Sequence, residues 1–244
     1  MSPDIIGPDL LIALGIAVAA GLMRGFAGVG SGMLMAPFFV QLYGPVDTVA
    51  IIILMEIVVT AQLLPGVRKH INWRVVGPMG LAAALLMPIG SWLLVSLDGA
   101  LVGKIVAIVV VVSSLILLTG WRYRGAKPIY ATLGVGSLSG LLMALTSLGN
   151  PPVMLYLLSS QDSAATNRAN FTGYFAVTLI ALILQMSISG LIDWSVLWTV
   201  AALLPVFIGA AWVGSRLFRK SSETLYRRVA LCILLCAGIY GLTQ

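Results

Sequence analysis

The sequence GLMRGFAGVGSGMLMAP at residues 21–37 places a glycine-rich break inside a long apolar segment. A second break, GLLMALTSLGNPPVMLY, occupies residues 140–156, 119 positions further along the chain. In a lipid bilayer, non-helical backbone is tolerated only where it is buried in protein or lines a wet cavity, because every N–H and C=O needs a partner. Paired breaks at matching places in two halves indicate the binding site of a small-solute carrier.

The composition is that of a membrane protein. Apolar residues make up 60% of the chain, charged residues 9%, and the mean hydropathy is +1.06, whereas a soluble domain carries about 25% charged residues. A membrane-spanning helix needs about 20 apolar residues. We therefore expect an all-α polytopic membrane protein without a separate soluble domain. The predicted spans are 46–65, 75–97, 101–120, 166–190, 194–215 and 225–243.

The net charge of +6 does not indicate a nucleic-acid partner, because the Lys and Arg residues lie in short loops between apolar runs. The two cysteines, Cys232 and Cys236, are four residues apart in the last apolar run and are interpreted as packing residues. The one histidine, His70, has no Cys/His cluster beside it. We expect no metal, no cofactor and no catalytic residues, so the chain is predicted not to be an enzyme.

The two halves of the chain match beyond the breaks. The tripeptide INW at 71–73 pairs with IDW at 192–194, and each follows a polar turn and opens a helix. We divide the chain into a first repeat, 1–124, and a second repeat, 125–244. Each repeat is expected to hold one broken segment followed by three ordinary transmembrane helices.

The positive-inside rule predicts that the two repeats are inverted. Three basic clusters, at 68–74, 122–127 and 216–228, are placed in the cytoplasm. The second broken segment, 129–159, then enters and leaves from the cytoplasmic side as a re-entrant helical hairpin. The first, 10–42, enters from outside, so that both tips meet near the bilayer midplane and both chain termini are extracytoplasmic.

The two tips have the features of an anion site. Asn150 is a favoured N-cap and Pro151 fits a first helical position, so the returning arm starts there; in the first half the matching start is at 31–32. Each helix N-terminus offers free N–H donors and a partial positive charge. The alternative interpretation is that the glycines only allow close helix packing, as GxxxG spacings at Gly21/Gly25 and Gly28/Gly32 often do. The predicted substrate-binding residues are Arg24, Gly28, Gly30, Ser31, Gly32, Thr146, Ser147, Gly149, Asn150, Pro151, Arg168 and Asn170.

Two ionisable residues interrupt the apolar sequence near the first tip. Arg24 either draws the anion in or pairs with a carbonyl or an acid. Glu56, an acid well inside an apolar run, is a candidate proton carrier or a structural partner of Arg24. Arg168, which opens the helix after the second hairpin, is either a substrate contact or an ordinary cytoplasmic anchor.

These motifs resemble the sulfite exporter TauE/SafE family, also called the toluene sulfonate uptake permeases. The resemblance rests on GFAGVGSGMLMAPFF at 25–39, VRKHINWRV at 67–75, the helix of Gly90 and GNPPVMLYLL at 149–158 followed by Arg168. It implies a bacterial inner-membrane carrier of sulfur-containing anions such as sulfite, sulfonates or sulfoacetate-like compounds. The family's second motif often reads Gly-Gly-Pro-Pro, and Asn150 departs from it. The positions carried over are Gly28, Gly30, Gly32, Pro37, Gly149, Pro151, Pro152 and Arg168.

Three functions fit the sequence, and different observations would distinguish them. The first is a secondary transporter that binds a small anion, with or without H⁺, and moves one inverted half against the other. The second is an anion channel, distinguished by poorly saturating flux. The third is a membrane subunit that delivers a sulfur species to a partner enzyme, distinguished by stable co-purification with a soluble protein.

Overall fold

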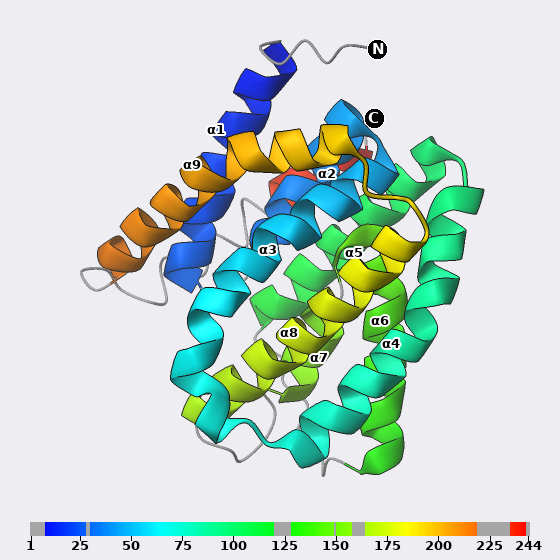
Figure 1. The fold of residues 1–244 in the computed structure, drawn as a ribbon, viewed down its shortest axis with the longest axis vertical. Helices are drawn as coiled ribbons and strands as arrows, with labels where there is room; N and C mark the ends of the chain where they lie inside the picture. The colour runs from blue at the N-terminus through cyan, green and yellow to red at the C-terminus, as the bar shows by residue number, and fades with distance from the viewer. Residues whose placement is uncertain are drawn as a thin grey trace.

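The structure is a computed structural model that describes residues 8–27, 30–119, 128–148, 150–157, 164–218 and 235–242. Within these ranges all regular secondary structure is helical (Figure 1). A further helical segment at 235–242 lies near the C-terminus. In chain order the elements are α1 (Pro8–Ala27), α2 (Ser31–Tyr43), α3 (Pro45–Val67), the 3₁₀ turn η1 (Arg68–His70), α4 (Trp73–Ser96), α5 (Gly99–Thr119), α6 (Ile129–Thr146), α7 (Asn150–Leu157), α8 (Ala164–Ile188) and α9 (Trp194–Phe218).

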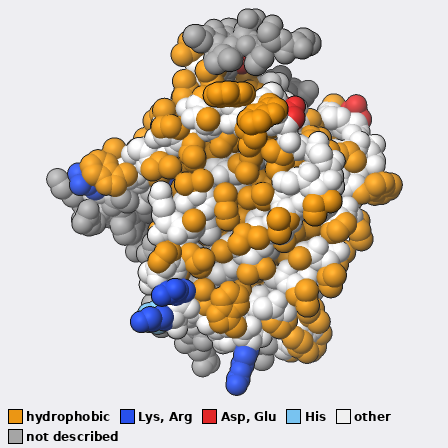
Figure 2. All heavy atoms as spheres, viewed as in Figure 1, with side chains coloured by type: hydrophobic (Ala, Val, Ile, Leu, Met, Phe, Trp, Pro, Cys, Tyr) orange, Lys and Arg blue, Asp and Glu red, His pale blue; other side chains and the backbone are white. Residues whose placement is uncertain are grey.

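Six of the described helices are long and apolar enough to cross a membrane: Pro45–His70, Trp73–Ser96, Gly99–Ile116, Ile129–Thr146, Ala169–Ile188 and Trp194–Gly214. The predicted all-α polytopic membrane fold is therefore confirmed. Five of the six correspond to predicted spans, and the sixth, α6, is the first arm of the second broken segment. The predicted span 225–243 lies mostly outside the described residues. Leu81, Leu85 and Trp92 on α4 are more than 60% exposed, which suits a surface that faces lipid (Figure 2).

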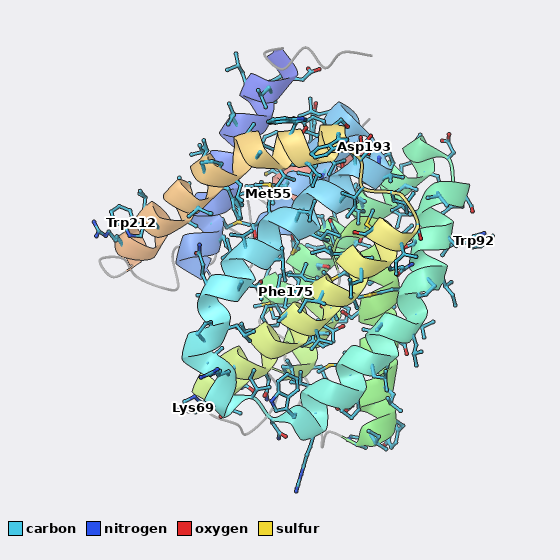
Figure 3. All side chains as sticks on the ribbon, in the orientation of Figure 1. Met55, Lys69, Trp92, Phe175, Asp193 and Trp212 are labelled. Carbon is cyan, nitrogen blue, oxygen red and sulfur yellow. The ribbon has the colours of Figure 1, made fainter. Side chains whose placement is uncertain are left out.

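Two groups of charged side chains mark opposite ends of the molecule. Figure 3 shows Asp193 at one end and Lys69 at the other. Figure 2 shows acidic side chains at the upper end, and basic ones both at the lower end and at the left edge. Asp47 lies close enough to Asp193 for their charges to repel. We call the end with Asp47 and Asp193 the acidic end, and the end with η1 and the start of α4 the basic end.

Polar caps decide where α4 and α9 begin. The Asn72 side chain accepts a hydrogen bond from the Arg74 N–H at 3.2 Å, and Asp193 Oδ1 accepts one from the Val196 N–H at 3.0 Å. Each side chain thus satisfies an N–H that the first helical turn would leave without a partner. The helices start at Trp73 and Trp194, as the matching INW and IDW sequences predict.

The Asp193 cap carries a prediction about stability. Hydrogen bonds from the Val196 N–H and the Ser195 hydroxyl lower the pKa of Asp193. A lowered pKa in the folded state stabilises the fold above the ordinary carboxyl pKa of about 3.9, and the contribution is lost as the pH falls through the folded value. We expect Asp193→Ala to reduce the free energy of unfolding at neutral pH by about 1 kcal/mol, measured by chemical unfolding in detergent micelles. Asp193→Asn is the control and should retain most of the stability, because Asn caps helices as well as Asp does; equal losses in both variants would contradict the capping role.

Each broken segment begins and ends at the same end of the molecule. Asp9, at the start of α1, lies close enough to Tyr43, at the end of α2, to affect its titration, and α3 then starts at Pro45. In the second half α6 runs in the same direction as α4, because Gly136 lies against Met79 and Gly140 against Ala83. Both helices therefore start at the basic end. The chain is back at that end at the start of α8, where Asn170 accepts a hydrogen bond from Asn72.

The two halves of the chain pack against each other through their broken segments. The first arm of each segment packs along a helix of the other half, α1 against α9 and α6 against α4, while α3 and α8 pack against each other. A methyl group on Gly25 would lie 1.8 Å from the Ala211 carbonyl oxygen, and one on Gly140 would lie 2.2 Å from the Ala83 carbonyl oxygen. The packing interpretation of Gly21 and Gly25 is thus confirmed, because both lie against the α9 backbone.

Candidate functional site

The first tip lies between α1 and α2. Gly30 precedes α2 with φ of 95°, a left-handed conformation that favours glycine. The first N–H groups of a helix have no intrahelical acceptors, and among the described residues no side chain caps those of α2. The helix starts at Ser31, as predicted. Gly28 lies outside the described residues.

A buried ion pair lies beside this tip. Arg24, near the end of α1, places Nη2 3.3 Å from Glu56 Oε2 on α3, and their side chains are only 5% and 4% exposed. The Ser31 hydroxyl donates a hydrogen bond to the other carboxylate oxygen of Glu56. Of the two roles considered for Glu56, the structure shows partnership with Arg24. One carboxylate therefore connects both arms of the first hairpin to α3.

The second half contacts the same guanidinium through an aromatic ring. The Arg24 Cζ atom lies 5.7 Å from the centre of the Phe175 ring on α8, within range of a cation–π interaction. Phe175 is buried, and Figure 3 labels it near the middle of the view. Sequence reasoning missed Phe175, yet a signal was present, since it lies 119 positions after Glu56, the same offset that separates the two breaks.

The second tip is held by its own hydroxyl groups. Thr146 Oγ1 donates to the Leu142 carbonyl at 2.7 Å and accepts from the Leu148 N–H at 3.2 Å. Ser147 adopts a left-handed φ of 60° and donates to the Thr146 carbonyl at 2.5 Å. The returning arm α7 starts at Asn150, as predicted. The hydroxyls of Ser31, Thr146 and Ser147 were predicted as donors to a ligand, and all three donate to protein acceptors in this conformation.

The two tips lie next to each other. A methyl group placed on Gly32, in the first turn of α2, would lie 3.9 Å from both the Ser147 carbonyl oxygen and the Leu148 side chain. It would also lie 3.4 Å from Ile52 on α3. The structure thus brings together Arg24, Gly30, Ser31 and Gly32 of the first tip with Ser147 of the second.

Other predicted site residues lie apart from this centre or outside the description. Asn170 is fully buried, but its Oδ1 accepts from the Asn72 N–H at 2.7 Å, which places it toward the basic end. Pro151 is buried in the first turn of α7. Gly149 and the side chains of Asn150 and Arg168 lie outside the described part of the structure.

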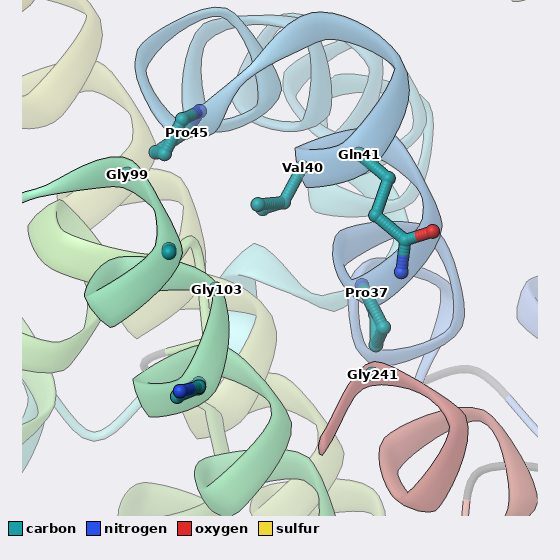
Figure 4. A pocket seen from close by; sticks show the side chains of 9 residues that line it. Pro37, Val40, Gln41, Pro45, Gly99, Gly103 and Gly241 are labelled. Atoms are coloured by element: carbon teal, nitrogen blue, oxygen red, sulfur yellow. The ribbon is translucent and has the colours of Figure 1, made fainter. Parts of the chain in front are cut away.

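A cavity of about 280 Å³ is separate from the tips. It lies between α2 and α5 and is lined by Pro37, Gln41, Gly103 and Lys104, among others (Figure 4). None of the predicted substrate-binding residues that the structure describes lines it. The candidate site is therefore the junction of the two tips around the Arg24–Glu56 pair.

Membrane-length helices that surround two broken segments and a buried ion pair are the architecture of a membrane transport protein. The chain belongs to the sulfite exporter TauE/SafE family, which matches residues 13–241. The "probable sulfite/organosulfonate exporter TauE" of Cupriavidus necator is 25% identical over 242 residues, covering 94% of this chain and 93% of that protein. No solved structure matches the chain significantly. The predicted family is confirmed, and with it the assignment to transporters rather than enzymes.

Proposed function

We propose that this protein is a secondary transporter that binds a small sulfur-containing anion, such as sulfite, a sulfonate or a sulfoacetate-like compound, between its two tips. The observation that carries the proposal is the Arg24 guanidinium, which is buried beside the N-terminus of α2. A guanidinium and free helix N–H groups are both suited to sulfonate or sulfite oxygens. The relative from Cupriavidus necator, named for export of sulfite and organosulfonates, supports this substrate class.

We propose that the halves 1–124 and 125–244 are inverted repeats that give alternating access. The packing of α1 against α9 corresponds to that of α6 against α4, with α3 and α8 paired between them. The first broken segment begins and ends at the acidic end, and the second begins and ends at the basic end. With the basic end in the cytoplasm of a bacterial inner membrane, the two hairpins are re-entrant from opposite sides and the N-terminus is extracytoplasmic; the C-terminus is assigned to the same side from the sequence.

The closed centre favours a carrier over a channel. The tips are tightly packed in the described conformation. Arg24 is paired with Glu56, Gly32 contacts the second tip, and Gly25 lies against the backbone of α9. A continuous pore would require all of these contacts to be broken at the same time. Reconstituted protein should therefore show saturable uptake and counterflow of a labelled sulfonate, and high, poorly saturating conductance would instead identify a channel.

Anion binding by the purified protein tests the proposed site. We expect calorimetry and thermal shift to detect selective binding of at least one sulfur anion from a panel of methanesulfonate, sulfite, sulfoacetate, thiosulfate and sulfate, with acetate as the carboxylate comparison. Gly32→Ala should reduce the affinity about tenfold or more, a loss of about 1.4 kcal/mol, with little change in stability. Its methyl group meets only ordinary van der Waals neighbours, but it projects between the tips.

Gly77→Ala on α4 is the matched control, because its methyl group would meet nothing within 4 Å. This variant should bind like the wild type. If Gly32→Ala binds as tightly as Gly77→Ala, the anion does not lie between the tips. If no sulfur anion binds to the wild type, the proposed substrate class is wrong.

A further inference from the structure

Two buried charges stand out from the other charged side chains. Arg24 and Glu56 are 5% and 3% exposed as whole residues, and among the described residues no other Lys, Arg, Asp or Glu is buried. Removing a charge from water is costly unless an opposite charge accompanies it. Each member of the pair therefore depends on the other in the conformation seen here.

A substrate anion at the tips competes with Glu56 for the same guanidinium. If the anion bound to Arg24 while Glu56 stayed ionised, two negative charges would share one positive charge in a poorly hydrated site. If Glu56 were protonated with no anion present, the Arg24 charge would no longer be balanced at this site. Two states avoid net charge, namely Arg24 paired with ionised Glu56, and Arg24 paired with a monovalent anion beside protonated Glu56.

We propose that Glu56 is a proton-binding site coupled to the anion site, so that one proton binds to its carboxylate when a monovalent sulfonate replaces that carboxylate at Arg24. This inference rests on the proposed function and names its coupling ion. Because both favoured states are neutral, the anion and the proton cross the membrane together. The transporter is therefore a proton–anion symporter.

The hydrogen bond between Ser31 and Glu56 changes direction in this scheme. Ionised Glu56 only accepts, and the Ser31 hydroxyl donates to it. Protonated Glu56 carries an O–H that can donate to Ser31 Oγ, which releases the one hydroxyl proton of Ser31 for the anion.

One turn further along α3, Thr60 has a buried hydroxyl with no hydrogen-bond partner among the described residues. Because residues four apart share a helix face, Thr60 provides a further donor on the face of α3 that carries Glu56.

The other titratable side chains that the structure describes near α3 lie away from Glu56. On α3 itself, Asp47 precedes Glu56 by nine residues, about 13 Å along the helix. On α8, the Tyr174 hydroxyl lies against Ser139 of α6. On α9, Arg216 stacks on the Trp212 ring at 3.5 Å.

The remaining elements that pack against α3 contribute charges only near their ends. The titratable side chains on them are Tyr43 at the end of α2, Arg68, Lys69 and His70 in η1, Arg74 at the start of α4, Lys104 in the second turn of α5 and Tyr130 at the start of α6. With α1 supplying Arg24, the described groups that touch the Glu56 carboxylate are Arg24 and Ser31.

Calorimetry of the full-length wild type tests the coupling. Methanesulfonate is the probe, because it keeps one negative charge throughout the working pH range. Titrations at one pH in buffers of different ionisation enthalpy count the protons taken up with the anion. We expect proton uptake of up to one proton per methanesulfonate, and an affinity that falls as the pH rises.

Glu56→Gln places a permanent neutral analogue of the protonated carboxyl at the same position. This variant should bind methanesulfonate with no proton uptake and with an affinity independent of pH. Asp47→Asn removes a carboxylate from the half-buried start of the same helix and should behave like the wild type. If the wild type binds methanesulfonate without proton uptake at every pH from about 5 to 9, the coupling is overturned and the proposed substrate class is left intact. Proton uptake that persists in Glu56→Gln also overturns it, whereas absence of binding by every anion in the panel removes the proposed function itself.

Discussion

Gly25→Ala is expected to lower the free energy of unfolding by about 3 kcal/mol, the upper end of the usual cost of overpacking a core. The added methyl group would lie 1.8 Å from the carbonyl oxygen and 2.6 Å from the carbonyl carbon of Ala211. These are backbone atoms of α9, so no side-chain rotation relieves the overlap. The helices α1 and α9 must move apart, and the contacts along their whole length weaken. Thermal unfolding in detergent micelles, followed by circular dichroism, measures the loss.

Gly15→Ala on the same helix is the matched control. A methyl group on Gly15 would meet nothing within 4 Å, so the substitution should raise the stability by about 0.5–1 kcal/mol through the helix propensity of alanine. The pair Gly140→Ala and Gly134→Ala repeats the comparison on α6, where a methyl on Gly140 would lie 2.2 Å from the Ala83 carbonyl oxygen and one on Gly134 would meet nothing. Equal stability of Gly25→Ala and Gly15→Ala would show that α1 and α9 are not in backbone contact.

The sequence was sufficient to predict helices whose ends are marked by local chemistry. Trp73 and Trp194 open helices because Asn72 and Asp193 cap them, and the starts at Ser31 and Asn150 follow from glycine and proline preferences that act over a few residues. All these signals come from residues close together in the sequence, so the sequence alone was enough to predict these features. Of the three basic clusters, the one at 68–74 lies at one end of the molecule, and the other two lie mostly outside the described residues.

The contacts within the site needed the structure, because they join residues far apart in sequence. Two interpretations of Glu56 fitted the sequence equally well, and only the folded arrangement shows Arg24 and Ser31 on its two oxygens. Phe175 has no polar atom to attract notice, although it follows Glu56 by the same 119 positions that separate the two breaks. The hydroxyls of Thr146 and Ser147 were expected to face a ligand, but backbone carbonyls within their own turn are nearer acceptors.

Arg24→Gln is expected to cost about 3–5 kcal/mol of stability, because it leaves the Glu56 carboxylate buried without its counter-charge. Glu56→Gln should cost a similar amount by leaving the Arg24 charge, while the double variant should be close to the wild type in stability, since removing both charges of a buried pair is often nearly neutral. Thermal unfolding of the four proteins gives the coupling energy between the two side chains. Additive losses in the double variant would show that the pair is not coupled.

Anion binding separates the two members of the pair in a way that stability does not. The double variant should be folded yet bind no sulfonate, because the guanidinium is missing. Glu56→Gln should bind, and methanesulfonate should raise its unfolding temperature more than that of the wild type, because the bound anion supplies the negative charge that the substitution removed. Ser31→Ala is the comparison that keeps both charges and should respond to methanesulfonate like the wild type or more weakly. A larger anion-induced stabilisation in Glu56→Gln than in Ser31→Ala therefore follows only if the substrate and the Glu56 carboxylate occupy the same side of Arg24.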